Sequence, residues 1–222
     1  MPETPHIVSD VMTRTVVAVG RDASFKELVE TLSQWHVSAM PVLEGEGRVI
    51  GVVSEADLLP KEEFRDSDPD RFEQLRRLPD LAKAGAVTAE ELMSSPAVSV
   101  HTDATLAEAA RIMAVKGVKR LPVVDAEGKL QGIVSRGDLL KVFLRSEEDI
   151  EEEVRRTVVS YLFPDNSSVR VRVADGVVTL SGQLADTALI PVAARLTRAV
   201  EGVVDVECHF RGVGRDEPHH PT

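Results

Sequence analysis

Two short phrases in the chain combine a serine with an aspartate three residues later. GVVSEADLL occupies residues 51–59 and GIVSRGDLL occupies residues 132–140, so the phrases stand 81 residues apart. At the start of a helix, a serine hydroxyl and free backbone N–H groups suit a phosphate, and a carboxylate one turn later can accept hydrogen bonds from both ribose hydroxyls. The candidate ligand-binding residues are therefore Ser54 and Asp57 in the first phrase, and Ser135 and Asp138 in the second.

The same pairs also have a purely structural interpretation. Serine is a favoured N-cap, and an acid three residues later completes a capping box, so each pair could serve only to begin a helix. Gly51 and Gly132 favour the binding interpretation, because a glycine leaves space for a ligand to approach a strand. The sequence leaves both interpretations open.

The two copies differ in charge around these pairs. Cations suit an anionic phosphate, so we expect two sites of unequal affinity. A solvated surface is the alternative interpretation of the same charges, and the sequence leaves open which site the cations serve. The second copy carries Lys119, Arg120 and Arg136 where the first carries Ser38, Ala39 and Glu55.

The phrases close a longer repeat, which aligns without gaps at the offset of 81. Each copy predicts a short strand (15–19 and 97–100), a helix, two strands, and a last helix that begins at the serine of the phrase. Gly117 is a good terminator of the second long helix, whereas His36 is a poorer one for the first. One unit of about fifty residues is small for a stable core, so two copies should pack together.

The doubled unit resembles a pair of CBS domains, the tandem called a Bateman module. The resemblance rests on the openings MT and MSSPAVSV, the AMPV and RLPV strands and the two Ser-x-x-Asp phrases, and it covers residues 7–145. CBS pairs bind adenosine-containing ligands in clefts between the repeats and commonly form homodimers. The resemblance implies that the serines contact phosphate and the aspartates hold ribose. The implied ligand is AMP, ADP, ATP, NAD or S-adenosylmethionine, with no cofactor required.

A long connection separates the two repeats. We expect the first repeat over residues 1–62, a partly helical connection over 63–87 and the second repeat over 88–145. Within the connection, DPDRFEQLRRL has the composition of a helix after an Asp-rich start. A lid, a dimer contact and a solvated charged linker are the alternatives for this segment.

The C-terminal part follows a different pattern, α-β-β-α-β. SVRVRVADGVVTLSG alternates around an Asp-Gly turn, a helix is expected over 186–200 with Pro191 inside it, and GVVDVECHF forms the last strand. Residues 148–212 thereby resemble a BON domain, a class often suggested to bind phospholipid. Residues 149–211 hold 7 arginines and no lysine against 10 acids, so we favour an unknown protein partner over a membrane surface. The tail 213–222 is expected to be disordered.

Composition limits the remaining functions. The chain has 222 residues, a formal charge of −11 and a pI of about 5.1, which argues against nucleic-acid binding. Cys208 is the single cysteine, and no leader or membrane-spanning run is evident, so we predict a cytoplasmic protein. Neither a nucleophile motif nor a metal-ligand spacing is present, and neighbours Cys208 and His209 should face opposite sides of a strand. We therefore predict no enzymatic activity and no metal site.

The sequence thus predicts an α+β fold. Two β-α-β-β-α CBS-like units pack as a pseudo-twofold pair, and a small α-β-β-α-β BON-like domain follows. The predicted function is a regulatory protein that senses an adenosine nucleotide and relays its binding to the BON-like part. The alternative is a non-enzymatic structural or membrane-surface adaptor with no nucleotide bound.

Overall fold

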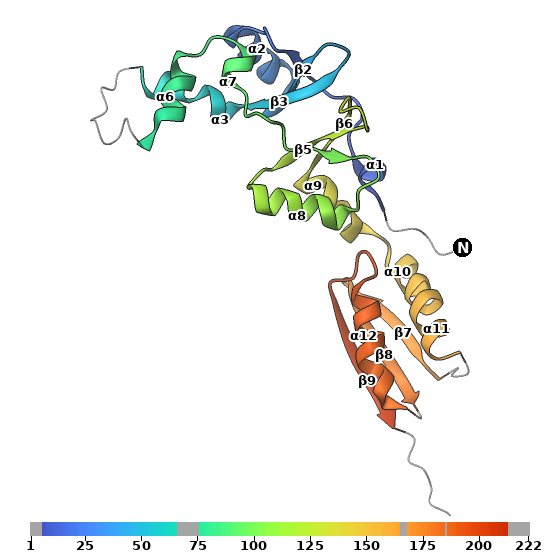
Figure 1. The fold of residues 1–222 in the computed structure, drawn as a ribbon. Coiled ribbons are helices and arrows are strands. Elements are labelled where there is room, and N and C mark those ends of the chain that lie inside the picture. The colour runs from blue at the N-terminus through green and yellow to red at the C-terminus, as the bar shows by residue number, and fades with distance from the viewer. Residues whose placement is uncertain (1–5, 66–75, 165–167, 185, 213–222) are drawn as a thin grey trace, which may run out of the picture. The chain divides into compact units, whose positions relative to one another are not determined.

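The computed structural model describes residues 6–65, 76–164, 168–184 and 186–212 (Figure 1). The chain divides into two compact units, one from His6 to Leu139 and one that begins at Leu140. The predicted disordered tail 213–222 lies outside the described residues.

Each repeat of the first unit builds a three-stranded sheet, in the orders β1-β2-β3 and β4-β5-β6. The first strand of each sheet runs parallel to the second, and the second runs antiparallel to the third. The first repeat comprises β1 (Val19–Gly20), α2 (Phe25–Trp35), β2 (Ala39–Glu44), β3 (Arg48–Ser54) and α3 (Glu55–Leu58). The second comprises β4 (Val100–His101), α8 (Leu106–Lys116), β5 (Arg120–Val124), β6 (Leu130–Ser135) and α9 (Arg136–Leu139).

The predicted α+β fold with its doubled β-α-β-β-α order is confirmed, with one local difference. The opening strands are only two residues long, because β1 and β4 pair with their neighbours over two residues each. His36 does end α2, in the left-handed conformation with φ of 51°, as Gly117 ends α8 at φ of 67°. Histidine adopts this conformation less readily than glycine, so position 36 is conformationally strained.

A short helix ahead of the first sheet belongs, by its hydrogen bonds, to the second sheet. α1 (Val8–Val11) precedes β1 in the chain and lies beside β5 and β6 in Figure 1. The N–H groups of Val8 and Ser9 donate to the carbonyls of Ala104 and Thr102, at 2.8 and 3.0 Å. Val8 is fully buried there.

The short helix that precedes the second sheet in the chain belongs, by its hydrogen bonds, to the first sheet. α7 (Ala89–Leu92) precedes β4 in the chain and lies beside β2 and β3. The N–H groups of Ala89 and Glu90 donate to the carbonyls of Ala23 and Arg21, at 2.9 and 3.0 Å. Each of these donors and acceptors lies 81 residues from the equivalent donor or acceptor in the hydrogen bonds of α1. The two helices are therefore exchanged reciprocally between the repeats, about a pseudo-twofold axis.

The hairpin turns of the two repeats meet on this axis. The Val49 N–H donates to the Gly128 carbonyl and the Leu130 N–H donates to the Gly47 carbonyl, each at 3.0 Å. The offset of 81 converts one bond into the other. Pairing of equivalent residues is the geometry of an isologous contact, here within one chain.

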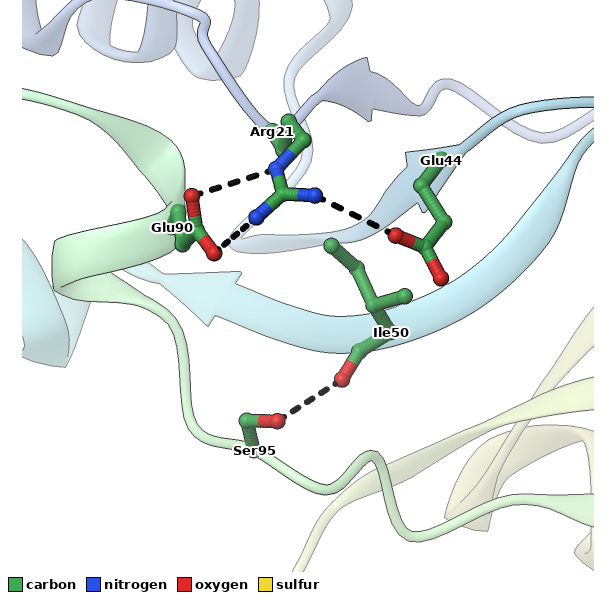
Figure 2. A network of polar contacts seen from close by, with 5 residues as sticks. All are labelled: Arg21, Glu44, Ile50, Glu90 and Ser95. Carbon is green, nitrogen blue, oxygen red and sulfur yellow. Dashed lines mark hydrogen bonds and ion pairs between the residues drawn. The ribbon is translucent and has the colours of Figure 1, made fainter.

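A polar network fastens α7 to the first sheet (Figure 2). Arg21 Nε donates to Glu90 at 3.1 Å, a second guanidinium nitrogen also contacts Glu90, and Nη1 donates to Glu44 at 3.3 Å. The hydrogen bond to Glu90 raises the pKa of Arg21 further above its ordinary value. Beyond the end of α7, the Ser95 hydroxyl donates to the Ile50 carbonyl of β3 at 2.9 Å.

Two helices of the connection lie against the end of the first repeat. α4 (Pro60–Glu63) follows α3 directly, and α6 (Leu78–Gly85) packs on both α3 and α4. Most of the segment DPDRFEQLRRL, for which the sequence predicts a helix, lies outside the described residues.

The second unit is a sheet in the order β7-β8-β9, with β7 antiparallel and β9 parallel to β8. The buried side chains of β7, Val171 and Val173, pack with Ile150 and Val154 of α10 and with Ala193 of α12. The elements are η1 (Leu140–Leu144), α10 (Glu147–Val154), η2 (Arg155–Val159), α11 (Ser160–Leu162), β7 (Arg170–Ala174), β8 (Val177–Leu184), η3 (Thr187–Leu189), α12 (Ile190–Arg198) and β9 (Asp205–Gly212).

The predicted α-β-β-α-β order of this unit is confirmed, and Pro191 explains a later helix start. α12 begins at Ile190 rather than 186, after the 3-10 turn η3. Proline has no N–H to donate, which matters least in the first turn of a helix. Within the described residues, no helix has both the length and the apolar character needed to span a bilayer.

Candidate functional site

Both Ser-x-x-Asp pairs lie where the last strand of a repeat passes into a helix. Ser54 ends β3 and precedes α3, and Ser135 ends β6 and precedes α9. Each of these helices has four residues, so its dipole can offer a phosphate little attraction, and the serine and carboxylate groups must provide most of any binding.

The capping interpretation of the pairs is correct. In the first repeat the Ser54 N–H and hydroxyl both donate to Asp57 Oδ2, at 2.8 and 2.7 Å. In the second, the Ser135 N–H and hydroxyl donate to Asp138 Oδ2, at 2.9 and 2.6 Å. In both pairs the capping hydrogen bonds go to Oδ2 of the aspartate. Whether the aspartate can also bind a ligand therefore depends on the contacts of its other oxygen, Oδ1.

The second oxygen of Asp57 is engaged by two residues that the sequence did not indicate. Lys83 of α6 forms an ion pair with Oδ1, and the Ser94 hydroxyl lies 3.5 Å from the same atom. Asp57 is 9% exposed, so these contacts lie below the surface. Ser94 could have been found, because it aligns with Thr13 at the offset of 81 and follows the exchanged helix α7. Lys83 lies in the connection, which the sequence assigns to neither repeat.

The three predicted cations lie around the second pair. Arg120 is the cross-strand partner of Ser135 on β5 and β6, so their side chains leave the same face of the sheet. Arg136 follows Ser135, and its guanidinium donates to the Val118 carbonyl at 3.1 Å. Lys119 is exposed, and its carbonyl accepts the Arg136 N–H at 3.2 Å.

Neutral or acidic residues take the corresponding places around the first pair. The cross-strand partner of Ser54 is Ala39, and the Glu55 N–H donates to the Ser38 carbonyl at 3.1 Å. The two candidate sites therefore have the same backbone arrangement but differ in the charge of the surrounding side chains. The second site has arginines next to its serine, whereas the first has a lysine on its aspartate.

A cavity of about 820 Å³ opens beside α2 and α3 of the first repeat. Arg120 is the one predicted site residue that lines it, and Ser38 and Glu55 are also among its lining residues. Neither Ser54 nor Asp57 contributes to its wall, which is largely apolar. The described lining residues are Phe25, Val29, Leu32, Ser33, His36, Val37, Ser38, Glu55, Leu58, Leu59, Lys61, Glu62 and Arg120.

The predicted role of Gly51 and Gly132 as space for a ligand is wrong. A side-chain carbon on Gly51 would collide with Met93, and one on Gly132 would collide with Met12 and with the Thr13 carbonyl. Met93 and Met12 follow the exchanged helices α7 and α1. The two glycines therefore admit the exchanged segments rather than a bound molecule.

The C-terminal unit provides no comparable pair. Cys208 packs partly into the core of this unit, while His209 lies exposed beside Glu207, with 3.3 Å between Nε2 and the carboxylate. Burial raises the pKa of the Cys208 thiol, which disfavours the nucleophilic thiolate. Throughout the described ranges, no three His, Cys, Asp or Glu side chains gather as a metal site.

Family comparisons agree with both units. The CBS domain family matches residues 8–61 and 89–145, and the BON domain family matches residues 146–213. The chain belongs to the CBS domain family and carries a BON domain after its CBS pair.

Individual relatives match the CBS part. The chloroplastic CBS domain-containing protein CBSX2 of Arabidopsis thaliana is 29% identical over 161 residues, which are 66% of this chain and 67% of the relative. An uncharacterized protein of Methanopyrus kandleri is 29% identical over 149 residues, which are 67% of this chain and 68% of the relative. The crystal structure of CBSX2 in complex with AMP has a TM-score of 0.55 and 30% identity, and covers 63% of this chain and 97% of that one.

Proposed function

We propose that the CBS pair binds an adenosine nucleotide, with AMP as the first candidate, and that binding regulates what the BON domain presents to a partner. The observation that carries this proposal is the pair of carboxylates, Asp57 and Asp138, each of which accepts the N–H and hydroxyl of its serine through Oδ2. A carboxylate held in this way can accept the two ribose hydroxyls through its second oxygen. A relative with 30% identity has been crystallised in complex with AMP, which supports the choice of nucleotide.

The pair Ser135–Asp138 is proposed as the stronger site. A nucleotide phosphate is anionic, and charge-assisted hydrogen bonds from arginine are among the strongest that proteins offer. Arg120 lies on the same face of the sheet as Ser135. Arg136 and Lys119 are the neighbours of these two residues in the chain, and the Arg136 N–H donates to the Lys119 carbonyl. At the pair Ser54–Asp57 the corresponding positions bring a glutamate and no arginine.

The structural adaptor is the second candidate, and the complete capping boxes favour it. Asparagine in place of aspartate separates the two roles. At Asp138 an asparagine oxygen still accepts the serine N–H, so a capping role predicts a stability loss of about 1 kcal/mol or less and nothing else. A ribose role predicts lost nucleotide binding with similar stability.

Thermal melting with ligand is the direct test of the binding proposal. A ligand that binds the folded state at 100 times its Kd adds about 2.7 kcal/mol of stability, so AMP at millimolar concentration should raise the melting midpoint by several degrees. The Asp138→Asn variant should lose most of this shift, and Asp57→Asn should lose less. The absence of any shift with AMP, ATP, NAD or S-adenosylmethionine would refute nucleotide binding.

The proposed relay, the homodimer and the partner of the BON domain depend on this first step. A ligand shifts the arrangement of two domains only if it binds one arrangement better than the other. Small-angle scattering and mass measurements of the full chain, with and without AMP, test the relay and the dimer together. Flotation with anionic liposomes tests whether the partner is a membrane surface.

A further inference from the structure

The ion pair of Lys83 with Asp57 places a cation on the atom that a ribose would need. Capping employs Asp57 Oδ2, and Lys83 contacts Oδ1, the oxygen that remains. The side chains of Lys83 and Asp57 are only 23% and 11% exposed, so water competes weakly for this contact.

Helix α6 is held in place by contacts other than this ion pair. At its C-terminal end, the Lys61 ammonium donates to the Ala84 carbonyl at 3.0 Å. At its N-terminal end, Arg77 contacts Glu63 of α4 through both terminal guanidinium nitrogens and donates to Asp80 at 2.9 Å. The hydrogen bond from Arg77 also lowers the pKa of Glu63. Lys83 therefore reaches Asp57 from a helix that is anchored at both ends.

α6 precedes the exchanged helix α7, so the offset of 81 places its counterpart ahead of α1, and residues 1–5 there lie outside the described residues. The two Ser-x-x-Asp pairs share their capping geometry, and at the first pair α6 adds the contact of Lys83 with the second carboxylate oxygen.

We propose that helix α6 is a built-in competitor that closes the Asp57 site, with the Lys83 ammonium bound where the ribose hydroxyls of a nucleotide would bind. This inference rests on the nucleotide binding proposed above and specifies how one of its two sites is regulated. A nucleotide can occupy Asp57 only in the fraction of molecules in which Lys83 has moved away, and its apparent affinity falls by that fraction. The Asp138 site fills first, because Arg120 and Arg136 lie next to Ser135.

The test is calorimetric titration of the full chain with AMP. The variant Asp138→Asn reports on the Asp57 site alone, and Lys83→Met is added to it because methionine keeps the apolar stem and removes the charge. We expect Lys83→Met to tighten AMP binding at the Asp57 site about tenfold. It should leave the Asp138 site unchanged when measured in the Asp57→Asn background. Lys116→Met, at the exposed end of α8, is the matched control and should change neither site.

Hydrogen exchange supplies a second readout. Displacement of Lys83 by AMP should accelerate amide exchange in residues 78–85 while it protects β3. Unchanged AMP binding in the Lys83→Met background would refute the proposed closure, because Lys83 would then have no effect on the site. Weaker AMP binding in that background, or protection of residues 78–85 by AMP, would also refute it, because Lys83 would then be a contact of the ligand. If AMP binds at Asp138 and Lys83 has no effect, only the closure fails. If no variant binds AMP, the nucleotide proposal fails with it.

Discussion

Substitution of Leu92 by alanine should destabilise the repeat that precedes it in the chain. Leu92 is fully buried in α7, yet it belongs to the hydrophobic cluster of the first sheet, together with Leu28, Val42 and Val53. Removing a fully buried leucine side chain costs about 3 kcal/mol, from the lost transfer energy and the cavity left behind. With a denaturant dependence of about 2 kcal/mol per molar urea, the unfolding midpoint of this unit should fall by about 1.5 M.

Hydrogen exchange measured strand by strand shows which sheet depends on Leu92. A loss of about 3 kcal/mol corresponds to about 100-fold faster exchange for amides that open with the affected core. The acceleration should appear first in β2 and β3. Val8→Ala, in the exchanged helix α1, is the matched control and should accelerate β5 and β6 instead, at a cost of about 2 kcal/mol. Faster exchange of β5 and β6 in Leu92→Ala would refute the reciprocal exchange of helices.

Three further outcomes follow from individual side chains. Thr197 is fully buried in α12, and its hydroxyl finds no partner in the described part of the chain, so Thr197→Val should raise the stability of the BON domain by about 1 kcal/mol, measured by urea unfolding; a loss of stability would contradict this. Arg145 pairs with Glu153 at 2.7 Å with both side chains less than one-fifth exposed, so Arg145→Met should cost about 2 kcal/mol, and equal stability of the two proteins would show that the pair is idle. The N–H groups of Val87 and Thr88 lower the pKa of Glu91 below 4.5, so its contribution to stability is present above that pH and is lost as the pH falls through the lowered pKa. Glu91→Gln should therefore make the free energy of unfolding depend less on pH between pH 3 and 5. An unchanged pH dependence would count against this role of Glu91.

Much of the fold could be predicted because each repeat has internally consistent signals. The capping serine or threonine with its glutamate, the apolar spacing of α2 and α8, and the paired strands around each turn all favour the same element order. The serine and aspartate of each candidate site could be predicted for the same reason, because helix capping is a local property. Their orientation in the structure follows from residues only three positions apart.

The exchange of α1 and α7 could not be predicted, for a reason that lies in the repeat itself. When two copies are similar, the apolar residues that suit one sheet also suit the other, so the pattern is the same whether Val8 packs on its own repeat or on the next. The choice depends on the length and path of the connecting segments. The same applies to Gly51 and Gly132, whose small size has a meaning only once Met93 and Met12 are in place.

Lys83 could not be predicted because nothing local relates it to Asp57, 26 residues earlier. Its position depends on how α6 folds back on α3 and α4, through contacts such as that of Lys61 with the Ala84 carbonyl. Charges in a connection between repeats ordinarily remain in solvent. A lysine that reaches a capped aspartate is visible only in three dimensions.

A crystal structure of the full chain grown with AMP tests the central claim most directly. We predict an adenosine in the second repeat, with its ribose hydroxyls within hydrogen-bonding distance of Asp138 and its phosphate facing Ser135 and Arg120. AMP bound only in the apolar cavity beside α2, or Asp138 left without contact to a nucleotide that calorimetry shows to be bound, would contradict it.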